Sequence, residues 1–415
     1  MSIWNPVWQV EINGVDYTNA ILSNLTITSG RTNIYEQAQA GYINIELINL
    51  DQSPITAEIN QSISVQLQDS TATFVPIFGG SIVDVKVGIQ DSGGVTYAQK
   101  ITIIALGALA RLPKYLTNGV LNQDFDGDQI YTILSGVLFA QWNAVPAAET
   151  WAAYDPAVQW QDAENTGLGE IDQPGNYELA QRSSSRTDVY SLVAALATSG
   201  LGYIYEDANG LIGYADSTHR TAYLAVNGYV DLTANEALAN TISIQTRAGD
   251  VRNSVTIKYD QNSTSEVSES DAESIATYGT LAQIITTTIK HQADANDQAD
   301  FYIALRANPH SIFSAITYEL TNPEITDADR DALLNIFMGM PVFISDLPLN
   351  MNAGSFAGFV EGWTFRAAYN QVSVTPLFSP LAYSIQSMAW DDVPGVEAWN
   401  TISGILDWQN ATIVA

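Results

Sequence analysis

The stretch from Phe356 to Pro380, FAGFVEGWTFRAAYNQVSVTPLFSP, decides how we interpret the fold. Large apolar and aromatic side chains crowd its first half, and Val372 and Val374 resume an every-second-residue alternation in its second half. Such patterns indicate β-strands, and Tyr369-Asn370-Gln371 supplies a polar turn between the two halves. We therefore expect a hairpin that closes a β-barrel, with Pro376 stopping its second strand.

Composition indicates a globular protein with an unusual charge. The chain has 415 residues, of which 46% are hydrophobic, and this length favours about two to four domains. It carries 15 Lys and Arg against 45 Asp and Glu, a formal net charge of −30. Such a chain does not attract DNA or anionic lipid in general, because both need cationic neutralisation. Two interpretations stay open: the acidity lines a channel through which DNA slides, or it serves solubility, for example in a salty medium.

Several kinds of site and segment are missing from the sequence. There is no cysteine, which excludes disulfides, thiolate zinc sites and cysteine nucleophiles. The opening residues, MSIWNPVWQVEING, lack the basic and apolar regions of a secretory signal peptide. No apolar run approaches the ~20 residues that span a bilayer. We expect synthesis and folding in a cytoplasm, with exposure outside coming by another route such as a virion.

Residues 1–112 predict one strand after another. Asn13-Gly14 is a strong signal for a two-residue hairpin turn. Apolar residues alternate with polar ones at Trp8, Val10 and Ile12, at Ile43, Ile45 and Leu47, at Ile63, Val65 and Leu67, at Val83, Val85, Val87 and Ile89, and at Ile101, Ile103 and Ala105. This pattern favours a small barrel or sandwich with one solvent-exposed face.

Residues 113–240 predict an α+β insertion. Asp128 is expected to cap a helix whose apolar positions are Ile130, Ile133, Leu134, Val137 and Leu138. A second helix starts near Thr187-Asp188 and ends at Gly200. Residues 203–214 read as a hairpin.

Residues 241–383 predict a second β-rich part with two helices. The helices are expected from Asp294 to Ala307, and from the capping box at Thr326 as far as Phe337. Strands are expected at Val255–Tyr259, Ile312–Leu320 and Pro341–Ile344. The polar stretch Asn262–Ser274 predicts a mobile loop.

Residues 384–415 form a C-terminal extension with Trp390, Trp399 and Trp408 at a regular spacing. The extension is too short to bury these rings alone. Either it docks on a neighbouring protein or it packs on the chain's own barrel.

We assign no catalytic residue and no cofactor. His219, His291 and His310 lie far apart and are interpreted as ordinary surface or core residues. Neither a Gly-x-Ser-x-Gly elbow nor a phosphate-binding glycine loop occurs. Carboxylate pairs such as Asp391-Asp392, or Glu319 with Glu324, are expected by chance in so acidic a chain.

One segment, Asn122 to Asp128, raises the question of a metal. Asp124, Asp126 and Asp128 alternate and Gly127 takes the sixth place, as in the first half of a calcium loop. The twelfth place is Ile133, where the loop needs a bidentate glutamate. A turn followed by an Asp N-cap explains the same residues, so we assign no metal ligand.

Several stretches together resemble the minor tail or tail-hub proteins of long-tailed bacteriophages, which are related in architecture to the baseplate hub of contractile-tailed phages. The likeness covers most of residues 4–383. The stretches are WQVEINGVDYTNAILSNLTITSGRT, INIELIN and IFGGSIVDV in the first part, DGDQIYTIL and SGLGYIYEDANGLIGYADSTHR in the insertion, and RAGDVRNSVTIKY and GFVEGWTFRAAYNQVSVTPLFSP in the last part.

The resemblance implies an α+β, mainly β chain with two β-barrel hub domains and an α/β insertion between them. It implies a homotrimer, a ring whose six barrels match the sixfold tail tube and adapt it to the tail tip. The tail tube or a distal tail ring protein would lie above the ring and tip or fibre proteins below. The ring would surround a channel that passes DNA without specific binding during genome ejection. Such a protein is a structural part of the virion and not an enzyme.

Two other functions are weighed against this one. A receptor module that binds carbohydrate is the first, because 20 Tyr and 9 Trp could stack on sugar rings. A cell-wall hydrolase carried on the tail is the second, and its catalytic carboxylates would not be visible from sequence spacing. Aromatic residues in a β-rich chain more often form core and subunit contacts, which favours the hub.

Overall fold

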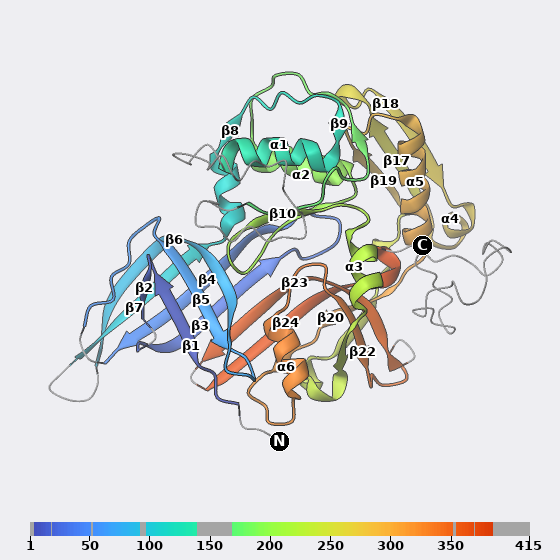
Figure 1. The fold of residues 1–415 in the computed structure, drawn as a ribbon. Coiled ribbons are helices and arrows are strands. Elements are labelled where there is room, and N and C mark those ends of the chain that lie inside the picture. The colour runs from blue at the N-terminus through green and yellow to red at the C-terminus, as the bar shows by residue number, and fades with distance from the viewer. Residues whose placement is uncertain are drawn as a thin grey trace.

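The computed structural model describes residues 4–17, 19–50, 53–91, 97–138, 168–351, 354–368 and 370–384. Its largest element is a sheet that has twelve strands within these residues (Figure 1). The strand order is β15-β22-β23-β3-β4-β7-β6-β5-β1-β2, with β24 pairing with β23 and β21 pairing with β24. The chain is therefore mainly β with additional helices, as the sequence predicts.

Both ends of the chain supply strands to this sheet. The N-terminal part contributes β1 (Trp8–Ile12), β2 (Val15–Asp16), β3 (Ile21–Gly30), β4 (Gln39–Asn49), β5 (Ser62–Gln68), β6 (Phe74–Asp91) and β7 (Tyr97–Leu106). Later segments contribute β15 (Val230–Thr233), β21 (Tyr318–Glu319), β22 (Pro341–Ser345), β23 (Phe356–Ala368) and β24 (Gln371–Pro380).

The predicted alternation is confirmed in β4, β5 and β7 but not in β6, where none of the four named apolar residues, Val83, Val85, Val87 and Ile89, is buried. The apolar positions named for β4 and β5 are buried, with less buried neighbours between them. At the β1–β2 turn, Asn13 and Gly14 have φ of 51° and 77°, as a two-residue hairpin turn requires. Val87 and Ile89 on β6 are nevertheless 61% and 71% exposed. The reason is that β5 pairs with β6 only as far as Ser81, so the outer half of β6 is a sheet edge within the described residues.

The hairpin predicted from residues 356–380 is confirmed as β23 and β24. The prediction that Pro376 stops its second strand is wrong, because β24 continues to Pro380 and Pro376 lies opposite Trp363. The other neighbour of β24 is β21, which pairs only at Ser373 and Val374. Pro376 therefore has no second strand neighbour among the described residues, and a proline without an N–H group is tolerated there.

Strand β23 joins the two β-rich parts. Its residues 356–359 pair with β22, whereas Gly362–Ala368 pair with β3. The N-terminal and C-terminal parts thus share one sheet. Its terminal strands β15 and β2 do not pair with each other in the described part of the chain, so two closed barrels are not confirmed.

The insertion packs two helices against a small sheet (Figure 1). Its elements are η1 (Ala108–Lys114), β8 (Leu116–Thr117), β9 (Asp124–Phe125), α1 (Asp126–Leu138), β10 (Leu168–Ile171), β11 (Glu178–Leu179), β12 (Thr187–Asp188), α2 (Val189–Ser199), β13 (Tyr203–Glu206), β14 (Ile212–Ala215) and α3 (His219–Asn227). The β13–β14 hairpin and helix α2 are confirmed, and Asp188 caps α2 by accepting a hydrogen bond from the Ser191 N–H. Helix α1 begins two residues before the predicted cap, so Asp128 lies inside its first turn.

A further layer places helix α5 on a three-stranded sheet. The remaining elements are β16 (Ser243–Thr246), β17 (Ser254–Tyr259), β18 (Ser265–Ser270), α4 (Ala272–Tyr278), β19 (Ala282–Thr286), α5 (Gln292–Arg306), β20 (Ser311–Ala315), α6 (Asp327–Leu334), η9 (Leu381–Tyr383) and short 3-10 turns at 234–236, 239–241, 248–250 and 261–263. Both predicted helices are confirmed as α5 and α6, although α6 ends before Phe337. The strand predicted from Ile312 to Leu320 is divided between β20 and β21.

The loop predicted at residues 262–274 is wrong. Its residues form β18 and the start of α4, and β18 pairs along its whole length with β17. Only Val267 of β18 is buried. The strand is therefore held by backbone hydrogen bonds at a solvent-exposed edge, and a polar composition does not reveal it.

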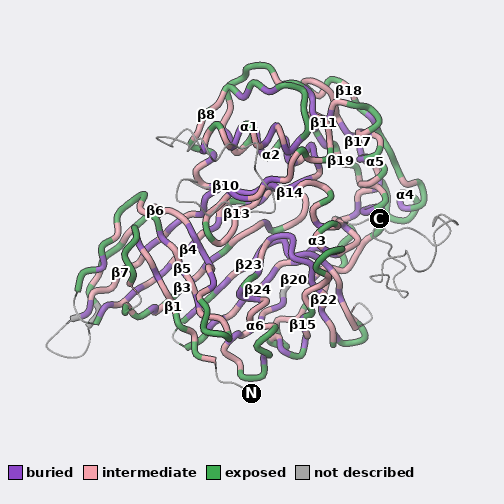
Figure 2. The backbone as a smooth tube through the Cα atoms, in the orientation of Figure 1, coloured by how far each residue is buried: buried purple, intermediate pink, exposed green. Residues whose placement is uncertain are grey.

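Buried residues follow the inner faces of all these layers (Figure 2). No helix in the described residues is both long and apolar enough to cross a membrane. The extension expected at 384–415 lies outside the described residues except for Ser384, and so do its three tryptophans and Asp391-Asp392. The domain boundaries drawn from the sequence stay a prediction.

Candidate functional site

A cluster of buried charged side chains lies at a bulge in β23. The register between β23 and β24 shifts between Val360 and Gly362, and Glu361 occupies the shift. A bulge redirects a side chain out of the regular alternation. Here the carboxylate is directed into the interior, and Glu361 is 1% exposed.

Two buried arginines bind this carboxylate. Arg31, directly after β3, donates from Nε to Oε2 of Glu361 at 2.6 Å. Arg220 of α3 donates from Nη1 to Oε1 at 2.8 Å and from Nη2 to Oε2 at 2.9 Å. Ser379 on β24 donates a further hydrogen bond to Oε1. The cluster therefore ties the insertion to both halves of the large sheet.

The electrostatics of the cluster keep Glu361 ionised. Burial raises the pKa of a carboxyl group, but the charges of Arg220 and Arg31 and their hydrogen bonds outweigh it and lower the pKa of Glu361 to about 2. Both guanidinium groups also lie over the ring of Tyr203 on β13, at 5.3 Å for Arg31 and 4.8 Å for Arg220. Such cation–π contacts add to the attraction and fix the orientation of the two side chains.

A glycine allows the backbones to approach at this point. Gly30 has a φ of 86°, and a Cβ on it would lie 2.3 Å from the carbonyl oxygen of Glu361. The Arg31 N–H donates to that same oxygen at 2.8 Å. A side chain at position 30 would therefore separate Arg31 from its partner.

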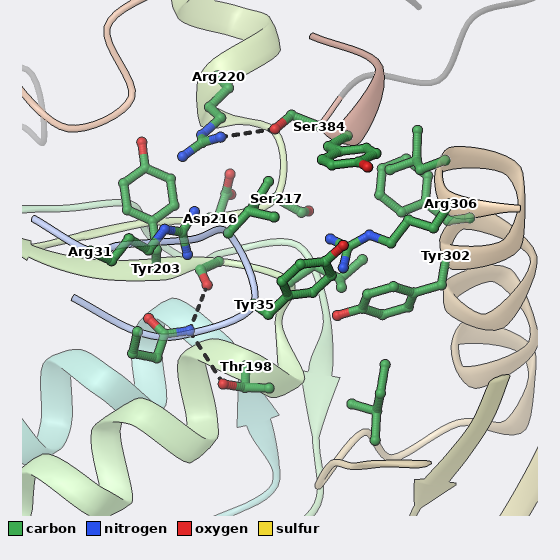
Figure 3. Close-up of a pocket in the computed structure, with 18 of the residues that line it drawn as sticks. Arg31, Tyr35, Thr198, Tyr203, Asp216, Ser217, Arg220, Tyr302, Arg306 and Ser384 are labelled. Atoms are coloured by element: carbon green, nitrogen blue, oxygen red, sulfur yellow. Dashed lines mark hydrogen bonds between the residues drawn. The ribbon is translucent and has the colours of Figure 1, made fainter. Parts of the chain in front are cut away.

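A cavity of about 120 Å³ adjoins the cluster (Figure 3). Its walls come from the loop after β3, the end of α2, the start of β13, α3, β19, α5 and η9. In Figure 3, Arg306 and Tyr302 project from α5 towards Tyr35, and Arg31 and Tyr203 lie across the cavity. The cavity thus lies where the N-terminal part, the insertion and the α5 layer meet.

A second carboxylate, which is half-buried, joins the insertion to the sheet. Glu206 on β13 accepts hydrogen bonds from the N–H groups of Gly41 on β4 and Leu109 on η1. Burial raises the pKa of Glu206 to about 7. A Cβ at Gly107 would lie 1.9 Å from its Oε1, so a glycine is needed there for the carboxylate to reach its donors.

In the segment Asn122 to Asp128, which was considered as a calcium loop, Asp126 and Asp128 accept hydrogen bonds from other parts of the insertion. Asp126 is buried and accepts hydrogen bonds from the N–H groups of Asn176 and Tyr177 at 2.8 Å and from the Tyr214 hydroxyl. Burial raises the pKa of Asp126 to about 6. Asp128 instead accepts from Gln173 at 3.1 Å. No group of acidic or histidine side chains that could hold a metal ion is found in the described part of the chain.

The three histidines do not come together. His219 pairs with Asp172 through Nδ1 at 2.8 Å, and His291 pairs with Glu178 through Nε2 at 2.7 Å. His310 packs edge-on against the Tyr383 ring at 5.3 Å between centroids. Burial lowers the pKa of His310. Each histidine thus has its own local partner.

Glu319 and Glu324, which we interpret from the sequence as a chance pair, have separate surroundings in the structure. Glu319 accepts hydrogen bonds from the Val372 N–H at 3.1 Å and from Thr321, which fixes it beside β24. Glu324 is exposed in the turn before α6. These contacts hold the backbone in place.

Sequence reasoning missed the residues of the cluster and the cavity. The available signal was Glu361 itself, a single charge within the apolar run FAGFVEGWTF. A carboxylate in such a run indicates a buried partner, because an unpaired buried charge is costly. Nothing in the spacing identifies Arg31, Arg220 or Arg306 as candidates.

Comparison with known proteins gives a match at the level of structure. No protein-family model matches the sequence, and no curated protein matches it. The tail protein from Neisseria meningitidis MC58 superposes with a TM-score of 0.57 and 12% identity, over 92% of this chain and 98% of that one. The 43 kDa tail protein of prophage MuSo2 from Shewanella oneidensis gives a TM-score of 0.52 and 12% identity, over 91% and 99%.

The chain is thus a mainly β protein with the fold of a tail protein. Its fold is shared with the prophage tail protein along nearly the whole length of both chains. The resemblance expected from the sequence is confirmed as a likeness of fold.

Proposed function

We propose that this protein is a structural hub of a phage tail, and that three copies form a ring between the sixfold tail tube and the tail tip. The observation that carries the proposal is the match to two solved tail proteins over 98% and 99% of their lengths. A fold alone does not determine function. A match that includes the insertion as well as both β parts supports a shared structural role better than a match to one common module.

The proposed ring needs two barrel-like modules in each copy, so that three copies present six. The large sheet supports this arrangement. Its N-terminal half, β1 to β7, and its C-terminal half, β22 to β24, are each mainly antiparallel, and they meet at the β3–β23 pairing. In the proposed ring, each half of the sheet would form one barrel-like module, completed by contacts with neighbouring elements.

The cluster around Glu361 supports a role as a rigid ring component. It binds the insertion, through Arg220, to both halves of the sheet, through Arg31 and Ser379. A ring that carries load between tube and tip needs its parts fixed to one another. We propose no catalytic step, since Glu361 is fully engaged by structural partners.

The proposed ring surrounds the channel through which the genome leaves. The net charge of −30 supports a lumen that repels phosphate and does not trap DNA in transit. The tail tube or a distal tail ring protein would contact one side and tip or fibre proteins the other. The protein would be assembled in the bacterial cytoplasm and end at the tail tip of the virion.

Mass measurement and labelling test this function. Light scattering of the purified full-length protein should give three times the mass of the 44.9 kDa chain. Antibodies against it should label the tip of intact particles. A monomer that binds glycans on an array would favour the receptor alternative, and clearing of peptidoglycan in a zymogram would favour the hydrolase.

A further inference from the structure

Arg306, at the end of α5, is a buried charge with incomplete hydrogen bonding. The residue is 4% exposed, and within the described residues neither its Nε nor its Nη1 has a hydrogen-bond partner. Buried polar groups are almost always satisfied by protein, water or a ligand, because an unsatisfied one is costly. The side chain lines the cavity of Figure 3, which is the direction from which a partner could come.

Aromatic rings hold the Arg306 guanidinium without satisfying it. Its central carbon lies 4.2 Å from the ring centroid of Tyr35, 5.0 Å from that of Tyr302 and 5.8 Å from that of Tyr383. Cation–π contacts stabilise the charge. The Tyr35 side chain is also a hydrogen-bond partner of the guanidinium. Nε and Nη1 have no such partner in the described residues, so these two groups stay available for an anion.

The other charges of the cavity leave Arg306 uncompensated. Arg31 and Arg220 share Glu361. Asp216 also lines the cavity, and its Oδ1 accepts from the N–H groups of Thr218 and His219. Asp250 lies near Tyr35, but within the described residues it forms no ion pair with Arg306, and its Oδ2 has no hydrogen-bond partner.

We propose that this cavity binds a carboxylate group and that Arg306 is the residue that pairs with it. A carboxylate matches the planar guanidinium in shape and adds one negative charge. A phosphate dianion fits less well, because a second negative charge would face the carboxylates of Asp216 and Glu361. The tyrosine rings around Arg306 suit the carbon frame to which a carboxylate is attached.

The dimensions of the cavity suit a small group. About 120 Å³ is room for several water molecules at ~30 Å³ each, and so for a short carboxylate-bearing chain. The carboxylate could belong to a free small molecule or to a protein segment. Ser384 lines the cavity, and the sequence continues from it to Asp391 and Asp392.

Titration of the full-length protein with propionate, a short carboxylate with a single negative charge, tests the proposal. Calorimetry at constant ionic strength, kept with sodium chloride, should show saturable binding, and the melting temperature should rise over the same concentrations. Arg306→Met keeps the bulk and removes the charge, so it should abolish both effects. Should that variant fail to fold, Arg306→Lys should weaken binding at least several-fold, because an ammonium lacks the planar fork.

The double variant Asp391→Asn with Asp392→Asn, in the full-length chain, distinguishes the two sources. Propionate binding by both the unaltered protein and the double variant indicates a free ligand. Binding by the double variant alone indicates that the chain's own segment supplies the carboxylate. Absence of binding in both, or equal binding by the protein with Arg306→Met, overturns the proposal.

Asp250→Asn is the control for an internal partner. We expect this change to leave propionate binding unchanged or stronger. If the Asp250 and Arg306 changes instead destabilise the protein equally and are not additive, the two residues pair with each other. That result also overturns the proposal.

Discussion

Replacing Glu361 with Gln is the sharpest test of the buried cluster. The change keeps the shape of the side chain but removes the one negative charge between Arg31 and Arg220. Glu361 accepts four hydrogen bonds, three from the arginines and one from Ser379. A glutamine has a single acceptor oxygen, so part of the guanidinium edges would face an amide NH2 group.

The cost of this change follows from the burial of both arginines. Removing one partner of a buried ion pair costs roughly 3–5 kcal/mol, because it leaves a buried charge uncompensated. We therefore expect Glu361→Gln to lower the free energy of unfolding by about that amount at pH 7. Glu324→Gln is the matched control, since Glu324 is exposed and its change should stay within ~0.5 kcal/mol.

The pH dependence gives a second, independent readout. The pKa of Glu361 falls from its ordinary 4.5 to about 2 in the folded protein. A carboxyl group whose pKa is lower in the folded protein stabilises the fold at pH values above its ordinary pKa. This stabilisation is lost as the pH falls towards the pKa of the folded state. Urea unfolding should therefore show a constant difference between Glu361→Gln and the unaltered protein from pH 8 to about 5, and a shrinking one below about 4.5. A loss under 1 kcal/mol at pH 7, or a difference that grows on acidification, would refute the reasoning.

Three further predictions concern the insertion. The pKa of Glu206 is about 7 in the folded protein and 4.5 ordinarily, so between these pH values the folded protein keeps a proton that the unfolded chain loses. The free energy of unfolding should therefore fall as the pH rises from about 4.5 to about 7. Urea titrations at successive pH values should show this slope, and Glu206→Gln should flatten it. Gly107→Ala would place a Cβ 1.9 Å from Glu206 Oε1 and should lower the melting temperature through ~1–3 kcal/mol of strain. The control is Gly136→Ala in α1, where a Cβ would meet no atom within 4 Å, and this change should be neutral or stabilising by up to ~1 kcal/mol. Equal effects of the two changes would contradict the proposed contact. Asp188→Ala removes the cap of α2 and should cost ~1 kcal/mol in the same melts, while no change would mean that the cap contributes little.

Local patterns were enough to predict most elements but not their pairing. Helix α2 was found because its apolar spacing, its capping Asp188 and its terminal Gly200 all act within one segment. The β3–β23 pairing joins residues hundreds of positions apart, and two alternating strands look alike whichever neighbour they choose. The same limit explains why the sequence does not show that the two β-rich parts share one sheet.

The cluster was beyond local reasoning for the same physical cause. Arg31 and Glu361 are separated by 330 residues, and their attraction exists only after β23 lies beside β3. The sequence does not reveal β18 for another reason. Only one of its side chains, Val267, is buried, and the backbone hydrogen bonds that hold the strand to β17 leave no pattern in the sequence. Which polar residues stabilise the fold therefore depends on where they lie in the folded protein, and the composition of a segment does not show this.

Negative-stain electron microscopy of the purified full-length protein tests the central claim most directly. A structural hub should yield class averages of a closed ring with threefold symmetry and a stain-filled channel at its centre. Particles that stay single at micromolar concentration, or rings of another symmetry, would contradict the proposed threefold hub.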